Sequence, residues 1–382
     1  MPGAEGAVEV RPVAGREDLD RFIRLPMALQ GADPHYIPPL VMERREAFDP
    51  KRNPLFRHAE VQFFLAWRGG RPVGRISAQV DRLHLERYRD ATGHIGLVEG
   101  IDDPAVFAAL TGAAEAWLRA RGMRRATGPF NLSINEETGL LVAGFDRPPC
   151  VMMGHAQPHY RRRLEEQGYV KARDLIAYWF DLRRPIPPAV VRVSERGEAG
   201  RLVVRAIDPR RYREDVRTAI RLFNAAWAEN WSFIPFTPEE TDHMAASMKM
   251  LIERDMVCIA ELDGEPSGFG VGLPNLNEAI RDLGGRLFPF GIVKLLWRLK
   301  VRRVRSFRVP LMGVDPRFKG SMAGAGIVFK MIEFIRRNAM AKGYDQAELS
   351  WILEDNMPMR RIIEGIGAEP YKTYRVYEKA LA

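Results

Sequence analysis

The sequence predicts an α/β protein built from two similar halves. Residues 61–80 and 256–274 each consist of two apolar runs around a tight turn, Gly69-Gly70 in the first and Asp263-Gly264 in the second, which is the pattern of a β-hairpin. Each hairpin is followed by a helical pattern and then a short apolar run, so we expect mixed central sheets flanked by helices. A proline-rich break at residues 183–200 separates the halves.

The elements after each hairpin occur in the same order. In the first half, a helical pattern over 106–121 precedes a strand over 124–128, and in the second half a helix over 327–342 precedes a strand over 345–353. A further helix and a last strand over 373–377 complete the second half. At 382 residues the chain suits two domains of about 150–200 residues. We therefore expect a first domain at 1–182, a linker at 183–200 and a second domain at 201–382.

Composition narrows the class of protein. Hydrophobic residues make up 46% and charged residues 28% of the chain, as in globular proteins with an ample core. The two cysteines, Cys150 and Cys258, lie far apart and have no neighbouring histidine cluster, so we expect neither disulfides nor a metal site. We also expect no signal peptide and no membrane-spanning run, and a cytoplasmic location. The net charge of +9 favours an anionic partner, although a basic composition alone does not identify it.

The segment 308–326 has the pattern of an anion-binding site. An apolar strand ends at Val314 and leads through a basic, glycine-containing loop into a helix, whose first backbone N–H groups and positive dipole end attract anions. The alternative is a glycine-rich connection without a ligand. In the first half, the corresponding segment carries Glu99, Asp102 and Asp103, which would repel a phosphate. We therefore expect the cofactor in the second half only, on Met312, Gly313, Val314, Arg317, Lys319, Gly320, Ser321, Met322, Ala323 and Gly324.

This loop resembles the pyrophosphate-binding motif of the GNAT acyltransferases, and the order hairpin, helix, strand, helix resembles their fold. Because the order occurs twice, the chain resembles tandem GNAT-like proteins, including the Fem-type transferases. The resemblance implies coenzyme A or acyl-CoA as the acyl donor. It also implies that Asn356 contacts the pantetheine arm, although asparagine is equally suited to cap the following helix. Many GNAT enzymes have a tyrosine acid where this sequence has Ile363, so Tyr371 or Tyr374 could replace it.

A polar segment follows the first-half strand. Asn131, Ser133, Asn135, Glu136 and Glu137 lie within seven positions, and two adjacent carboxylates could raise each other's pKa and provide a general base for an amine. The alternative is a solvated loop. Glu354 is a further candidate base. His155 is another, and we place it among the substrate-contacting residues.

Two segments of the second half could contact a lipid. Trp227, Asn230 and Trp231 lie in an aromatic segment that could line an apolar acyl site or could be ordinary core. The segment from Leu287 to Arg305 combines apolar residues with six basic ones and no acidic one, which is typical of a helix on an anionic membrane. The alternative is a helix packed on its own domain with a basic outer face. No groove-reading motif accompanies it, which argues against nucleic acid as a partner.

Segments 128–145, 226–237, 273–279 and 349–379 together resemble the GNAT-related family that includes the bacterial ceramide synthases. The resemblance covers nearly the full chain and implies transfer of a fatty acyl group from acyl-CoA, or an acyl carrier protein, to a long-chain sphingoid-type amine. Together with the basic, apolar segment at 287–305, this activity would suit a peripheral location on the inner face of the cytoplasmic membrane. Three alternatives stay open at this point: a Fem-like transferase that uses aminoacyl-tRNA, a small-molecule N-acetyltransferase, and a non-catalytic membrane or nucleic-acid adaptor.

Overall fold

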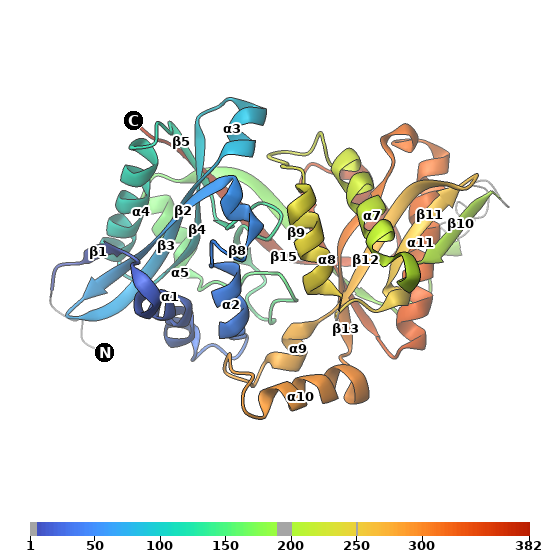
Figure 1. Ribbon diagram of the computed structural model, residues 1–382, viewed down its shortest axis with the longest axis horizontal. Coiled ribbons are helices and arrows are strands. Elements are labelled where there is room, and N and C mark those ends of the chain that lie inside the picture. Colours follow the sequence, from blue (N-terminus) through green and yellow to red (C-terminus); the bar gives the residue numbers. More distant parts are fainter. Residues whose placement is uncertain (1–5, 189–200, 250) are drawn as a thin grey trace. The chain divides into compact units, whose positions relative to one another are not determined.

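The computed structural model describes residues 6–188, 201–249 and 251–382 (Figure 1). These form two compact units. Unit 1 combines the chain up to Leu175 with Ile280–Ile292 and Lys372–Ala382, and unit 2 comprises Ile176–Ala279 and Val293–Tyr371. The domain bounds expected from the sequence stay a prediction, and residues 189–200 of the expected linker lie outside the described residues.

Unit 1 contains one sheet in the order β1-β2-β3-β4-β5-β15, and β8 also pairs with β15. All these pairs are antiparallel except β4–β5. Its elements are β1 (Glu9–Pro12), α1 (Gly15–Gln30), α2 (Val41–Ala47), η1 (Pro54–Arg57), β2 (Ala59–Arg68), β3 (Arg71–Asp81), α3 (Arg82–Tyr88), β4 (Thr92–Gly100), α4 (Pro104–Arg119), β5 (Arg125–Gly128), β6 (Phe130–Asn131), β7 (Glu137–Thr138), β8 (Leu140–Ala143), α5 (His159–Glu166), the start of β9 (Val170–Asp181) and most of β15 (Glu369–Ala380).

Unit 2 repeats this arrangement. Its strands run in the order β9-β14-β13-β12-β11-β10, and β13–β14 is again a parallel pair after an antiparallel hairpin. Its further elements are β10 (Leu202–Ala206), η2 (Pro209–Arg211), α7 (Tyr212–Ala226), α8 (Pro238–Met248), η3 (Arg254–Met256), β11 (Val257–Leu262), β12 (Glu265–Pro274), α9 (Leu276–Ile280), α10 (Gly291–Trp297), η4 (Arg298–Arg302), β13 (Ser306–Val314), η5 (Pro316–Phe318), α11 (Met322–Ala341), β14 (Gln346–Leu353) and α12 (Met357–Gly365).

Helices cover both faces of each sheet (Figure 1). In unit 1, α1 packs Phe22 and Ile23 against one face, while Leu110 of α4 lies against Gly74 on the other. In unit 2, Phe223 of α7 packs on one face, and Ile327 and Met331 of α11 pack on the other. The predicted fold class is therefore confirmed, because each half is a mixed sheet between two helical layers.

The turns and caps explain why the predicted hairpins form. Gly69 and Gly70, and likewise Asp263 and Gly264, have positive φ, which the twist of a two-residue hairpin turn requires.

One predicted helix start is wrong. Helix α11 begins at Met322 rather than Ile327, because the Ser321 side chain accepts a hydrogen bond from the N–H of Gly324 and so caps the helix earlier.

Within residues 6–188, 201–249 and 251–382, no helix is both long and apolar enough to cross a membrane.

Candidate functional site

The predicted anion loop of unit 2 is a tight connection between β13 and α11. The Asp315 side chain accepts a hydrogen bond from the N–H of Arg317 at 2.9 Å, and this bond holds the first turn of the loop. Gly320 has a φ of +74° and an open environment at its Cβ position, so glycine is the residue best suited to this point. The loop therefore delivers the N-terminus of the 20-residue helix α11 to the end of β13.

The other glycines of this loop serve packing. A Cβ atom at Gly324 would lie 2.2 Å from the carbonyl oxygen of Phe318. At Gly313 it would lie 2.7 Å from the ring of Phe269. A side chain at either position would therefore clash within unit 2, and the role of Gly313 and Gly324 in cofactor binding stays a prediction.

The basic side chains of the loop lie on the surface. The Arg317 guanidinium pairs with Asp315 at 3.0 Å, and Lys319 Nζ lies 2.5 Å from a carboxylate oxygen of Glu229. Exposed ion pairs of this kind contribute little to stability, because water and salt screen both charges. A phosphate could therefore compete for both cations at little cost.

Strands β13 and β14 pair over only part of their length. Their parallel ladder runs from Ser306–Gln346 to Val309–Leu349, and both strands continue beyond its last pair. Pro310 follows Val309 directly and has no N–H to donate. The two strands therefore form a fork beyond Val309 and Leu349.

A buried polar cluster, whose members are not recognisable as partners from the sequence, lies at this fork. Arg308 of β13 donates a hydrogen bond to Ser350 Oγ at 2.8 Å and lies 3.6 Å from the Glu348 carboxylate of β14. Ser350 and Tyr371 also donate to Glu348. In the sequence, the available signal was one charged residue within each of two apolar strands. Only the parallel pairing of the strands shows that Arg308 and Glu348 lie opposite each other.

The aromatic segment after α7 forms a satellite core of unit 2. Phe223, Phe233 and Phe269 are buried together, and Trp227 packs partly against them. The Trp227 ring also lies 5.6 Å from the ring of Trp351 on β14. Asn230 and Trp231 lie in the turn that follows, beside Glu229, whose carboxylate meets Lys319 of the anion loop. The ion pair between Glu229 and Lys319 therefore places this aromatic segment next to the anion loop.

The residues around α12 have clear local roles. Asn356 caps the helix by accepting a hydrogen bond from the N–H of Met359 at 3.3 Å. The Glu354 carbonyl accepts one from Arg360 at 2.9 Å, and Ile363 is buried in the core. Of the two tyrosines considered as acids, Tyr371 lies in unit 2, whereas Tyr374 belongs to unit 1.

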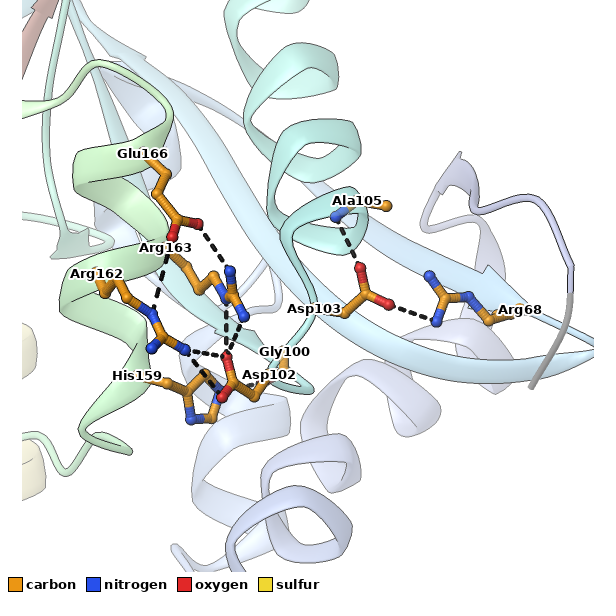
Figure 2. Close-up of polar contacts among 9 residues, drawn as sticks. All are labelled: Arg68, Gly100, Asp102, Asp103, Ala105, His159, Arg162, Arg163 and Glu166. Carbon is orange, nitrogen blue, oxygen red and sulfur yellow. Dashed lines mark hydrogen bonds and ion pairs between the residues drawn. The ribbon is translucent and has the colours of Figure 1, made fainter. Parts of the chain in front are cut away.

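In unit 1, the corresponding junction lies between β4 and α4, and side chains of unit 1 occupy it (Figure 2). Asp103 caps α4 by accepting a hydrogen bond from the N–H of Ala105 at 2.8 Å, and it also accepts one from Arg68 at 2.7 Å. The hydrogen bond from Arg68 lowers the pKa of Asp103, so the carboxylate stays ionised. An anion is thereby already present at the N-terminus of this helix.

The neighbouring carboxylate is also paired. Figure 2 shows Asp102 facing Arg162 and Arg163 of α5, at 3.0 and 2.7 Å. The β4–α4 connection is also short, since only residues 101–103 separate the elements, whereas residues 315–321 separate β13 from α11. These differences support the assignment of a phosphate site to unit 2 alone.

The polar segment of unit 1 is a small hairpin. Its strands β6 and β7 pair Asn131 with Glu137, and the Asn131 amide donates a hydrogen bond to the Glu137 carboxylate at 3.1 Å. Ser133 Oγ accepts a hydrogen bond from the N–H of Asn135 at 3.0 Å and so shapes the tip, which also carries Glu136.

Glu137 forms an ion pair with Arg44, an arginine that no motif in the sequence marks. Burial would raise the pKa of Glu137, but the charge of Arg44 and hydrogen bonds from Arg44 and Asn131 outweigh burial and lower the pKa. The expectation that an adjacent carboxylate raises this pKa is therefore wrong for Glu137. A carboxylate with a lowered pKa is a weak base, so this pair is better suited to positioning than to proton transfer.

We expect Glu137→Gln to destabilise the protein. It removes the carboxylate from a part-buried ion pair and leaves the Arg44 guanidinium paired with Glu43 at 3.2 Å, so the cost should lie below the about 3–5 kcal/mol of fully buried pairs. Since the folded pKa of Glu137 lies below its ordinary value of 4.5, the stabilisation is present above that pH and is lost as the pH falls through the folded pKa. Thermal melts at pH 7 and in acid measure both effects. Glu46→Gln, which removes an exposed pair with Arg52, should have little effect; equal melts for both variants would contradict this account.

His155 lies in the same unit and pairs with Asp33 at 2.8 Å. Neither Asp33 nor the neighbouring Tyr36 was recognisable from sequence, because both lie more than 110 positions away from His155. In the part of the chain that the structure describes, no group of three or more His, Cys, Asp or Glu side chains could hold a metal ion.

Comparisons with known proteins agree with this architecture. A tandem GNAT protein from the clavulanic acid biosynthesis pathway has a TM-score of 0.57 at 15% identity and covers 98% of this chain and 99% of its own. A GCN5-related N-acetyltransferase from Sphaerobacter thermophilus has a TM-score of 0.54 at 16% identity, covering 98% and 96%. These similarities establish the tandem GNAT fold.

Sequence comparison goes further. The bacterial ceramide synthase of Caulobacter vibrioides is 52% identical over 375 residues, 98% of each chain, and protein YghO of Escherichia coli is 47% identical over 97% of this chain and 95% of its own. No protein-family model matches the chain. Since identity at this level extends over 98% of the chain and therefore over both units, the protein is an N-acyltransferase of the GNAT-related family to which the bacterial ceramide synthase belongs.

Proposed function

We propose that the protein transfers a fatty acyl group from acyl-CoA to the amine of a long-chain sphingoid-type base. The observation that carries this proposal is the 52% identity to a bacterial ceramide synthase over 98% of both chains. Amide formation needs a neutral amine and an aligned thioester carbonyl, and positioning can supply much of the rate enhancement.

The anion loop of unit 2 is the proposed site for the donor's pyrophosphate. It combines the N-terminus of α11 with Arg317 and Lys319, whose present partners are exposed carboxylates. The fork between β13 and β14 would hold the thioester, and Asn356 would contact the pantetheine arm. Trp227 and Trp351 would line the start of the acyl chain.

The segment around α10 is the proposed membrane surface. Leu295 and Leu299 pack against the core of unit 2. Other large apolar side chains of the segment are exposed: Phe290 at 80%, Val293 at 65%, Trp297 at 50% and Val301 at 67%. A helix that only packs on its own domain would have a polar outer face. The six basic residues between Lys294 and Arg305 favour anionic lipid as the occupant.

An acyl-transfer assay tests the proposed function. The purified protein is given palmitoyl-CoA, acetyl-CoA or a palmitoyl acyl carrier protein, with either a long-chain amino alcohol or a short soluble amine. Mass spectrometry detects the amide, and a thiol reagent detects the released thiol. We expect a long-chain amide with at least about tenfold preference for the long-chain acceptor, since each buried CH₂ contributes about 0.8 kcal/mol.

The arms of this assay separate the alternatives. Acetylation of the short amine alone would identify a small-molecule acetyltransferase. If transfer occurs only from the palmitoyl acyl carrier protein, the donor is a carrier protein rather than CoA. Absence of any thioester-dependent product, with activity on aminoacyl-tRNA instead, would overturn the proposal.

A further inference from the structure

An exposed carboxylate lies beside the anion loop of unit 2. Glu229 is in the connection between α7 and α8, two neighbouring helices of that unit (Figure 1). Its carboxylate accepts a hydrogen bond from Lys319 Nζ at 2.5 Å, and the Glu229 and Lys319 side chains are 81% and 67% exposed. In the part of the chain that the structure describes, Lys319 is the sole polar partner of the Glu229 side chain.

The backbone around Glu229 is fixed by contacts other than this ion pair. The N–H of Asn230 donates a hydrogen bond to the carbonyl of Trp227 at 2.8 Å. Further along the connection, the side chain of Asn224 exchanges two hydrogen bonds with the backbone of Phe236, at 3.1 and 3.3 Å. These bonds close the connection at both ends, so Glu229 keeps its place when its side chain moves.

The end of α7 packs against the strand that leads into the anion loop. A Cβ atom placed on Gly313, next to the last residue of β13, would lie 3.2 Å from the Cβ atom of Ala226. Glu229 follows Ala226 by three positions. The position of Glu229 beside the loop therefore follows from the packing of α7 and does not depend on the ion pair with Lys319.

The loop contains a second carboxylate, whose role differs. Asp315 accepts the backbone N–H of Arg317 as well as its guanidinium, and so holds the first turn of the loop. The hydrogen bonds from Arg317 lower the pKa of Asp315, although burial opposes them. The hydrogen bond from Lys319 lowers the pKa of Glu229, so this carboxylate is also ionised at neutral pH. Glu229 thus adds a negative charge at the loop without holding the loop's backbone.

A donor phosphate and the Glu229 carboxylate would need the same ammonium group. Water and salt screen an exposed ion pair, so exchange of one anion for the other on Lys319 costs little. The displaced carboxylate still lies near the loop, because its backbone is fixed there, and like charges at short range repel. Glu229 should therefore weaken the binding of any phosphate at this site.

We propose that Glu229 competes with the phosphates of the donor for Lys319 and so keeps the affinity of the protein for coenzyme A low. This inference rests on the proposed function and adds a residue that sets donor affinity. Free CoA, the product of the transfer, lacks the apolar contacts that the acyl chain gives acyl-CoA. A carboxylate that replaces its phosphates on Lys319 favours its release and the binding of the next acyl-CoA.

Calorimetry with CoA and with palmitoyl-CoA tests this competition. Glu229→Gln keeps the shape of the side chain and removes its charge, so at low salt the Kd for both ligands should fall by about 3–10-fold. Glu229→Lys should lower the Kd further, because it adds a cation. The gain should shrink to less than about twofold in about 1 M salt, where the Debye length is about 3 Å. A variant that only disturbed the connection would weaken binding, so the direction of the change is diagnostic.

Two controls make the test specific to this pair. In a Lys319→Ala background, Glu229→Gln should tighten CoA binding by less than it does in the wild type, because the competition for the ammonium is gone. Glu369 forms a similarly exposed ion pair with Arg184 at 2.6 Å. This pair lies at the end of the sheet where β14 begins, away from the anion loop, so Glu369→Gln should leave the Kd for CoA within about twofold.

Turnover provides an independent measurement. Added CoA should inhibit palmitoyl transfer by Glu229→Gln at concentrations about 3–10-fold lower than those that inhibit the wild type, because the variant retains its product. The wild type and the Glu369→Gln variant should respond alike to added CoA.

The outcomes separate this inference from the proposed function. If the wild type binds CoA and Glu229→Gln binds it with equal or lower affinity, Glu229 is not a competitor. An equal gain in Glu369→Gln would reduce the effect to overall charge and would also overturn the inference. If the wild type binds neither CoA nor palmitoyl-CoA, the donor site of the proposed function is wrong, and this inference fails with it.

Discussion

We expect the double variant Arg317→Glu, Lys319→Glu to bind acyl-CoA at least about 100-fold more weakly than the wild type. Each cation would donate a charged hydrogen bond to the pyrophosphate, worth about 1.5–3 kcal/mol, and each substitution places a repelling charge there instead. Both side chains are exposed and their present ion pairs are weak, so the melting temperature should change little. Isothermal calorimetry with palmitoyl-CoA measures the affinity.

The control reverses a charge elsewhere on the same helix. Arg337 lies on an exposed position of α11, far along the helix from its N-terminus. Arg337→Glu should retain the wild-type affinity, because a helix dipole acts mainly within its first turn and salt screens distant charges. The donor site would have to be reassigned if the loop variant bound acyl-CoA within threefold of the wild type. Figure 2 shows that the junction between β4 and α4 in unit 1 is occupied by side chains of that unit. If Asp103→Ala weakened acyl-CoA binding as much as the loop variant is expected to, the donor site would instead lie in unit 1.

The second large effect concerns the membrane surface. We expect the triple variant Val293→Ser, Trp297→Ser, Val301→Ser to lower the partition of the protein onto anionic vesicles by on the order of 100-fold. All three side chains are exposed, and burial of each in a lipid interface would contribute about 1–2 kcal/mol. Flotation with vesicles of phosphatidylglycerol and phosphatidylcholine measures the partition. Activity on a long-chain acceptor should fall in parallel, whereas activity on a short soluble amine should persist.

Two matched variants make this test specific. Val203 is equally exposed but lies on β10, so Val203→Ser should leave vesicle binding unchanged. Lys300→Glu with Arg302→Glu should reduce binding most at low salt, because each basic residue near an anionic surface contributes about 1 kcal/mol that salt screens. If the wild type does not bind anionic vesicles even at low salt, the exposed apolar side chains around α10 do not form a membrane-binding surface.

Local sequence signals determined the elements of this protein and their order. The turns at Gly69-Gly70 and Asp263-Gly264 and the apolar periodicity on either side predicted both hairpins, because these features act over a few neighbouring residues. The predicted anion loop has the expected strand, turn and helix for the same reason. The helix start was misplaced only because a serine cap extended α11 by one turn.

The pairs that give each site its chemistry came only from the tertiary structure. Arg308 and Glu348 face each other because two strands pair in parallel, and Glu137 meets Arg44 across 93 positions of the chain. Likewise, His155 gains its orienting carboxylate from Asp33, 122 positions away. A carboxylate's charge and a histidine's tautomer depend on the side chains that pack against them, so the sequence identified the polar residues, and only the folded chain decided which of them pair.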